Sequence, residues 1–269
     1  MELERGTLWQ TVVARTAAAQ RSGALLPIET DGVVVEDQGI RFLVRVAKNL
    51  ARRAVTGEQR PPDFDPFDPP EPELTVGDVG PAHLAVLNKF NVVDQHLLLV
   101  TRRFVDQDEL LDAGDFRALW RCLEEVDGLG FYNGGRVAGA SQRHKHLQVV
   151  NAPVGAGGGR TAIDALARAH RLPFPSALAP FDADPLAAHT AYLSLLAEVD
   201  RARRAAPYNL LVTRDYLLVV PRTAESAQGI SMNALGFAGS LFVKTAAQLE
   251  LIRAVGPVEL LRAVCAPRA

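Results

Sequence analysis

Apolar residues recur at helical spacing in three stretches of the chain. Residues 1–20 carry apolar side chains at positions 8, 12, 13 and 17, and residues 108–127 show a similar stripe opposite a row of acids. Residues 185–204 repeat the pattern, with leucines, a tyrosine and a valine on one side. A stripe of this kind buries one face of a helix against a core, so the pattern predicts three amphipathic helices.

Other apolar stretches are short, β-rich and separated by turn residues. Residues 32–46 hold two such runs around EDQG, residues 83–90 and 96–104 form another pair, and residues 208–222 turn at Arg214-Asp215. Each pair predicts two antiparallel strands. The runs LLLVTR and LLVVPR resemble each other, which favours two related halves, although short apolar strands also look alike by chance.

Between these elements lies a proline-rich stretch, RPPDFDPFDPPEPEL, at residues 60–74. Proline fixes φ and removes a backbone donor, so this stretch predicts an extended surface loop. A loop of this length is either disordered or functional, or simply covers the surface, and we expect a covering loop. The chain from GFAGSLFVK onward is predicted to be mostly helical, with a break at Gly256-Pro257.

Composition narrows the class of protein. The chain has 269 residues, 48% of them hydrophobic, and a net charge of -2, so nothing indicates general affinity for nucleic acid or an anionic membrane. The two cysteines, Cys122 and Cys265, lie far apart and outside any CxxC motif. This argues against a disulfide framework or a thiolate zinc site. Without a signal-like or membrane-spanning run, we expect a cytoplasmic protein.

The stretch GGRVAGASQRHKHLQVVNAP, residues 134–153, concentrates the polar chemistry of the chain. Its second part predicts a strand, on which residues two apart share a face. His144, His146 and Gln148 therefore project together, whereas Lys145 and Leu147 face the other side. Three polar side chains in a row are costly to bury without partners, so this face lines a cleft or a ligand.

Four interpretations of the histidine pair compete. A metal site would need three or four ligands, and the other histidines (His83, His96, His170 and His189) fit no recognised ligand spacing. The pair could also be a hydrogen-bonded polar patch, or one ring could act as a general base, although no G-x-S-x-G motif or activated cysteine accompanies it. In the fourth interpretation an imidazole attacks phosphorus directly.

A phosphorus-directed nucleophile also requires donors for the phosphate oxygens. Gly135 and Gly139 allow close backbone approach, and Ser141 and Gln142 offer neutral donors. This local cradle favours the nucleophile.

SQRHKHLQ resembles the His-x-His-x-Gln signature of the transferase branch of the histidine-triad superfamily, and most specifically the ATP adenylyltransferases, or diadenosine tetraphosphate phosphorylases. The resemblance extends over roughly residues 60–245. It is carried in family order by EPELT, LNKFNVVDQHLLLVTRRF, FYNGG, YNLLVTRDYLLVVPR and ISMNALGFAGSLFVK. The sister branch of galactose-1-phosphate uridylyltransferases shares the signature but little else.

The resemblance implies an α+β, HIT-like fold: a mainly antiparallel sheet with helices packed on it. Together with the residue pattern, it predicts a HIT-like catalytic domain at residues 61–245. The pattern alone predicts an N-terminal helix and hairpin at residues 1–60 and C-terminal helices at 246–269, packed on the same domain as one compact unit. The activity implied is cleavage of a dinucleoside tetraphosphate by phosphate to ADP and ATP through an adenylyl-histidine. The alternatives are a hydrolase, another nucleotidyltransferase such as an ADP-sulfurylase, or a non-catalytic nucleotide-binding or metal-binding protein.

The same resemblance assigns roles to single residues. His146 is implied as the nucleophile, His144 as the residue behind it, and Gln148 as the replacement for the third histidine of the hydrolases. An amide can donate to phosphate but cannot take a proton from water, which favours transfer over hydrolysis. The implied substrate contacts are Ser141, Gln142, Asn133, Lys89, Lys244, Asn88 and Asn91.

Arg143 departs from the family pattern, in which acidic or polar residues are common at this position. The expected ligands are dinucleoside polyphosphate, ATP, ADP and phosphate. The sequence indicates no required cofactor, although Mg²⁺ can accompany the nucleotide.

Overall fold

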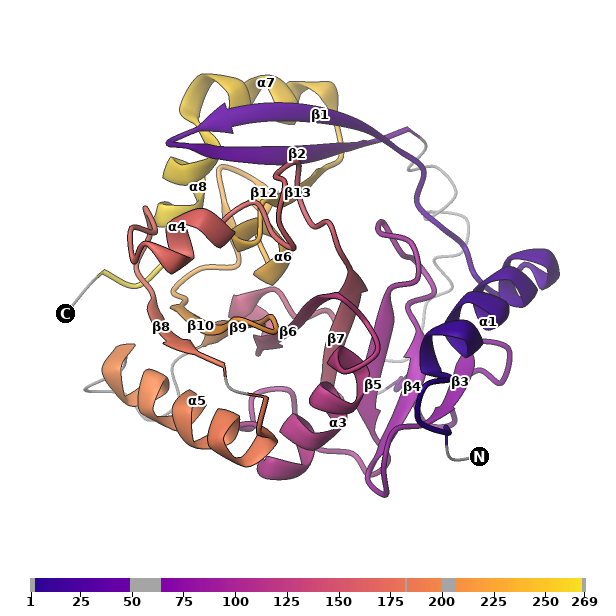
Figure 1. Ribbon diagram of the computed structural model, residues 1–269. Coiled ribbons are helices and arrows are strands. Elements are labelled where there is room, and N and C mark those ends of the chain that lie inside the picture. The colour runs from indigo at the N-terminus through magenta and orange to yellow at the C-terminus, as the bar shows by residue number, and fades with distance from the viewer. Residues whose placement is uncertain (1–2, 49–63, 182, 200–206, 268–269) are drawn as a thin grey trace.

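The computed structural model describes residues 3–48, 64–181, 183–199 and 207–267. Its centre is an eight-stranded sheet in which every neighbouring pair is antiparallel (Figure 1). In spatial order the strands are β3 (Thr75–Asp78), β4 (His83–Leu87), β5 (Leu97–Thr101), β7 (His146–Asn151), β6 (Gly128–Gly134), β9 (Tyr208–Val212), β10 (Tyr216–Pro221) and β8 (Ala177–Pro180). The predicted strand pairs at residues 83–104 and 208–222 are confirmed.

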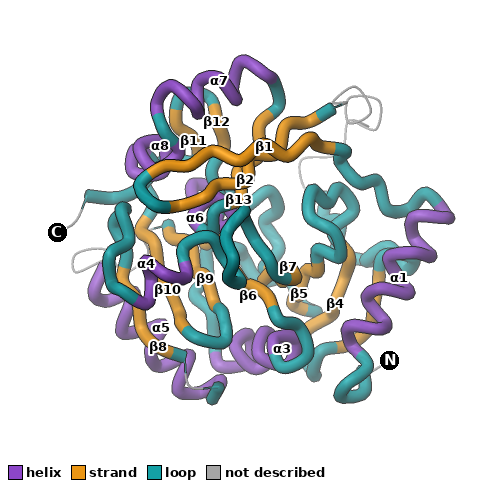
Figure 2. Tube along the Cα trace, turned by 45° about the horizontal axis from the view of Figure 1, so that its top comes forward, coloured by secondary structure: helices purple, strands orange, loops and turns teal. Residues whose placement is uncertain are grey.

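A smaller sheet lies over one face of the large one (Figure 2). It joins β1 (Thr30–Asp37), β2 (Ile40–Ala47) and β13 (Ser240–Val243), and a two-stranded ribbon of β11 (Ser226–Ala227) and β12 (Ile230–Ser231) accompanies it. The predicted hairpin at residues 32–46 is confirmed. Its two-residue turn, Gln38-Gly39, has positive φ at both positions, as such hairpin turns require.

Helices cover both faces of the large sheet and give the molecule two cores. On one face α1 (Leu8–Ser22), α3 (Ala113–Leu123) and α5 (Pro185–Val199) pack against buried strand residues such as Leu97, Leu147 and Val149. The other face packs against the small sheet and four helices: α4 (Asp164–Arg168), α6 (Ala234–Phe237), α7 (Ala246–Val255) and α8 (Pro257–Ala263). None of the described helices is long and apolar enough to cross a membrane.

The helix predictions hold in outline but not at their ends. The predicted helix at 108–127 is only α3, because the carboxylate of Asp112 accepts from the backbone N–H groups of Gly114 and Asp115 and caps the helix there. In α1 the apolar stripe is narrower than predicted, since Val13 is exposed. On α5, Leu186 and Leu193 are likewise exposed, and residues 200–204 of that prediction lie outside the described residues.

The C-terminal prediction was wrong in one segment. Residues 240–243, SLFV, form β13 instead of a helix, and they pair in parallel with β2, whose residues lie nearly 200 positions earlier. The predicted break is confirmed, because α7 ends at Val255 and α8 begins at Pro257. Overall the α+β architecture, mainly antiparallel with packed helices, is the one predicted.

Candidate active site

The histidine strand β7 lies inside the large sheet, between β5 and β6 (Figure 1). Leu147 and Val149 point into the helix-covered core, and His146 and Gln148 alternate with them. Lys145 turns to the helical side, where its Nζ donates to the carbonyl of Leu110 and lies 3.3 Å from Asp115. The predicted separation of Lys145 from the histidine pair is therefore confirmed.

The ring of His146 is held in one tautomer. Its Nδ1 lies 2.8 Å from the carbonyl oxygen of His144, and a carbonyl can only accept, so Nδ1 carries the hydrogen. The lone pair then resides on Nε2, which makes no hydrogen bond to the described residues. The side chain is 3% exposed, and burial lowers the pKa of His146 to about 4. The ring is neutral at pH 7 and has a lone pair to offer.

His144 is fixed by acceptors on both sides of its ring. Nδ1 lies 2.7 Å from the Asp65 carboxylate, and Nε2 lies 2.7 Å from the carbonyl oxygen of Thr101. Nε2 also lies 3.1 Å from the hydroxyl oxygen of Thr101, so the ring is held between Asp65 and the end of β5. These contacts fix the position of His144, whose backbone carbonyl oxygen accepts the Nδ1–H bond of His146.

Gln148 belongs to a chain of three polar side chains. Its Oε1 lies 2.8 Å from Nε2 of His96, and Nδ1 of His96 lies 3.3 Å from the amide nitrogen of Asn88. Asn88 donates and Gln148 accepts, so His96 is neutral with its hydrogen on Nε2. Burial lowers the pKa of His96 to about 4, which keeps the ring in this form. The amide nitrogen of Gln148 makes no bond to the described residues.

The proline-rich loop covers the two histidines. The ring of Phe67 lies 5.8 Å from the ring of His144 and 5.6 Å from that of His146, centroid to centroid. Asp65 in the same segment accepts from His144. The sequence predicts a loop that simply covers the surface. In the structure this loop packs over His144 and His146. Residues 60–63 of the predicted loop lie outside the described residues.

The remaining predicted contacts are distributed unevenly around this centre. Asn133 is buried in β6, where its Oδ1 accepts from Asn209 and from the backbone N–H of Ala234. Ser141 is exposed and Gln142 half-buried in the turn that leads into β7. These three residues flank the histidine strand in the sheet or in the chain, and their predicted role as phosphate contacts stays a prediction.

Lys89, Lys244 and Asn91 are not in hydrogen-bond contact with the histidines within the described residues. Both carboxylate oxygens of Glu71 accept from Nζ of Lys89, at 2.7 and 2.8 Å, in the turn after β4. Lys244 is exposed after β13, in the small sheet. Asn91 is buried and donates to the carbonyl of Val93. Their roles as substrate contacts also remain predictions.

Sequence reasoning missed three residues of this centre: His96, Asp65 and Gln107. The side chain of Gln107 bonds to the backbone of His146 and is 2% exposed. Each of the three lies 39 to 79 positions from its partner in the chain. Local motifs carry no signal for such contacts.

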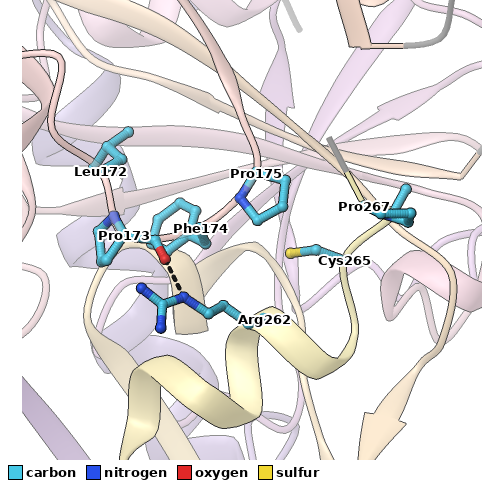
Figure 3. A pocket seen from close by; sticks show the side chains of 8 residues that line it. Leu172, Pro173, Phe174, Pro175, Arg262, Cys265 and Pro267 are labelled. Carbon is cyan, nitrogen blue, oxygen red and sulfur yellow. Dashed lines mark hydrogen bonds between the residues drawn. The ribbon is translucent and has the colours of Figure 1, made fainter. Parts of the chain in front are cut away.

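A cavity of about 530 Å³ lies elsewhere in the molecule (Figure 3). Its walls come from the segment before β8 and from the C-terminal end of α8, and they include Phe174, Arg262 and Cys265. Arg262 donates to the carbonyl of Pro173 across it, as Figure 3 shows. None of the residues predicted for the site lines this cavity.

Comparison with known proteins finds relatives along most of the chain. The profile of the Ap4A phosphorylase N-terminal domain matches residues 1–169, and that of the ATP adenylyltransferase C-terminal domain matches residues 170–267. The diadenosine 5',5'''-P1,P4-tetraphosphate phosphorylase 2 of Saccharomyces cerevisiae is 29% identical, over 90% of this chain and 89% of that protein. Protein APA1 of the same yeast is 28% identical, over 83% and 82%.

Solved structures show the same likeness. The crystal structure of yeast Ap4A phosphorylase Apa2 in complex with AMP is 26% identical, with a TM-score of 0.82 and full coverage of both chains. The complex of the same enzyme with Ap4A superimposes with a TM-score of 0.85, also with full coverage, at 24% identity. The two profiles together span nearly the whole sequence. The chain therefore belongs to the family of Ap4A phosphorylases, the ATP adenylyltransferases, which are nucleotidyltransferases.

Proposed function

We propose that this enzyme cleaves diadenosine tetraphosphate with inorganic phosphate, giving ADP and ATP, and that His146 is the nucleophile. The observation that carries the proposal is the ring of His146, whose Nδ1–H is bonded to the His144 carbonyl while Nε2 keeps its lone pair. Burial keeps this ring unprotonated at neutral pH. The yeast enzyme with the same fold was crystallised with Ap4A and with AMP, which supports a dinucleoside polyphosphate as substrate.

The reaction proceeds in two displacements at one phosphorus atom. Nε2 attacks the α-phosphorus, the bond to the oxygen bridging the α- and β-phosphates breaks, and ATP leaves with that electron pair. A phosphate oxygen then attacks the same phosphorus, the N–P bond breaks, and its electron pair returns to Nε2 as ADP departs. The transferred group is the adenylyl group throughout, so no redox partner is needed.

The neighbours of His146 suit the charges that these steps create. The adenylylated ring bears phosphorus on Nε2 and hydrogen on Nδ1, and is therefore positive. The carbonyl of His144 accepts the Nδ1–H bond at 2.8 Å and stabilises that charge. The amide nitrogen of Gln148 donates to a phosphate oxygen, and Ser141, Gln142 and Asn133 supply further neutral donors.

Gln148 also explains why phosphate is the acceptor. An amide has no basic site at neutral pH, so it cannot remove a proton from an attacking water. Phosphate is already an anion and needs no such help. The chemistry therefore favours phosphorolysis over hydrolysis.

The remaining assignments concern the surroundings of the site. We infer that the protein needs no resident metal and that Mg²⁺ enters with the nucleotide, because carboxylate and phosphate oxygens are its usual ligands. We further infer a reducing, cytoplasmic compartment. The two cysteines are free and buried, Cys122 in α3 and Cys265 after α8, and burial raises the pKa of both thiols to about 12.

The test is product analysis with radiolabelled diadenosine tetraphosphate. ADP plus ATP, formed only when phosphate is present, supports the proposal; AMP plus ATP without phosphate indicates hydrolysis. Label trapped on a histidine after acid-free denaturation identifies the intermediate. The His146→Ala enzyme should lose both label and turnover, whereas His170→Asn, an exposed histidine after α4, should keep them. Turnover of His146→Ala within about tenfold of wild type, or about 1.4 kcal/mol of barrier, excludes the nucleophile.

A further inference from the structure

The side-chain amide of Gln107 is inserted between two strands beside the nucleophile. Its Oε1 accepts from the backbone N–H of His146 at 2.8 Å. Its Nε2 donates to the backbone carbonyl of Asn133 at 2.9 Å and to that of His146 at 3.3 Å. One carboxamide therefore binds both backbone groups of His146 and ties them to β6.

This insertion occurs where the regular ladder between β6 and β7 stops. The last residue pair is Phe131 with Gln148, so two residues further along the same register would place Asn133 opposite His146. Those two residues do not pair directly. The carboxamide takes the place of a direct backbone N–H···O=C bond between the two strands.

The backbone of Gln107 is fixed independently of this contact. Its N–H donates to the carbonyl of Arg143 at 2.7 Å, and its carbonyl accepts from the hydroxyl of Tyr132 at 2.6 Å. The residue is 2% exposed, so its side chain cannot swing into solvent. Hydrogen bonds therefore hold Gln107 in place at its backbone as well as at its carboxamide.

The hydrogen bonds of Gln107 affect both the ring of His146 and the turn that precedes β7. The ring is oriented by its own Nδ1–H bond to the His144 carbonyl, so the backbone of residues 144–146 decides where Nε2 points. Gln107 also binds the turn of residues 135–143, which carries the predicted phosphate donors Ser141 and Gln142, because its backbone N–H donates to the carbonyl of Arg143.

We propose that Gln107 is a positioning residue for the adenylyl transfer: its carboxamide holds the backbone of His146 so that Nε2 faces the α-phosphorus. This inference rests on the proposed function of His146. It predicts a loss in the chemical step that exceeds the loss in nucleotide affinity. A merely structural role would lower stability and leave the rate of the folded enzyme near wild type.

The experiment uses Gln107→Met, which matches the length of glutamine and has no hydrogen-bonding ends. Rapid-quench measurement with labelled diadenosine tetraphosphate gives the rate at which adenylate forms on the enzyme. We expect it to fall thirtyfold or more, while the dissociation constant for AMP changes less than threefold. Val12→Ala, which removes buried methyl groups in α1, controls for a general loss of stability and should keep the wild-type rate.

The Gln107→Glu enzyme provides a second test if the methionine variant does not fold. Its carboxylate still accepts from the His146 N–H but faces two carbonyl oxygens, and protonation restores one donor. Its adenylation rate relative to wild type should therefore rise as the pH falls from 8 to 5. The wild-type enzyme measured over the same pH range controls for the other charged and titratable groups near residue 107, which include His144, His146, Asp106 and Asp108.

The outcomes separate this inference from the proposed function. Wild-type enzyme that forms no adenylate contradicts the role of His146 itself. Wild-type enzyme that forms adenylate, together with folded Gln107→Met that forms it within threefold of that rate, overturns the role of Gln107 alone. A Gln107→Glu ratio that is flat or falls toward pH 5 overturns it as well.

Discussion

His96 donates from Nε2 to the side-chain oxygen of Gln148 across 2.8 Å, and this bond decides which end of the amide faces outward. The nitrogen of Gln148 is left to donate. An amide without this partner can rotate by half a turn and present its oxygen to a phosphate, which repels it. His96, from the segment before β5, therefore sets the polarity of a group on β7.

Replacing His96 with leucine should impair transfer because Gln148 loses the partner that orients it. We expect kcat to fall about tenfold, which corresponds to one hydrogen bond of about 1.4 kcal/mol, with little change in KM. Steady-state kinetics with diadenosine tetraphosphate and phosphate measures the effect. His189→Leu on α5 serves as the control, and an unchanged kcat in His96→Leu would refute the orienting role.

The acid limb of activity should lie far below the usual range of histidine. Burial lowers the pKa of His146 to about 4 in the folded enzyme, so its neutral, nucleophilic form persists as the pH falls through 6.5. When free enzyme is mixed with diadenosine tetraphosphate, the single-turnover rate of adenylation of His146 should stay high down to about pH 5 and decline near pH 4. A midpoint at 6 to 7 for this limb would show that the ring is solvated.

The stability of the fold should decrease as the pH falls from about 6.5 to about 4. His96 and His146 both have a pKa of about 4 when folded and about 6.5 when unfolded, so the unfolded chain binds more protons between these values. The free energy of unfolding should therefore decrease as the pH falls from 6.5 to 4. Urea unfolding at several pH values measures it, and His96→Leu should show a shallower slope than wild type.

Opening the loop at Phe67 should admit water to the intermediate. Phe67→Ala removes the ring that packs on both histidines, so the adenylyl-histidine becomes accessible to water. We expect AMP to appear in the absence of phosphate, together with an acid limb shifted upward toward 6.5 as His146 is resolvated. Chromatography of the products over time provides the measurement. A product ratio equal to that of wild type would mean that the loop does not exclude water.

The elements of the fold could be predicted where the pattern is local. Strand alternation separated Lys145 from His144 and His146, and the turn residues Gln38-Gly39 marked the first hairpin. Pairing that depends on distant residues could not be predicted, and so SLFV appeared helical although it pairs with β2. The residues of the candidate site also divide into those that a local pattern predicts and those that only distant pairing brings together. His146 and Gln148 share a strand face, whereas Asp65, His96 and Gln107 meet them only because the sheet brings loops from both sides.

Lys145 presents a hazard for mutagenesis of this enzyme. Because Lys145 lies between two histidines in the sequence, it could be mistaken for a phosphate ligand. Its Nζ is instead buried on the opposite face of β7, against Asp115. Nε2 of His83 bonds to the same carboxylate at 2.7 Å. Lys145→Met should lower the free energy of unfolding by about 3 kcal/mol, because it leaves a buried carboxylate short of a partner. If this variant loses activity at the assay temperature, the loss would reflect unfolded protein and not a catalytic role of Lys145. Rates should therefore be compared per folded enzyme, after the concentration of folded protein has been determined.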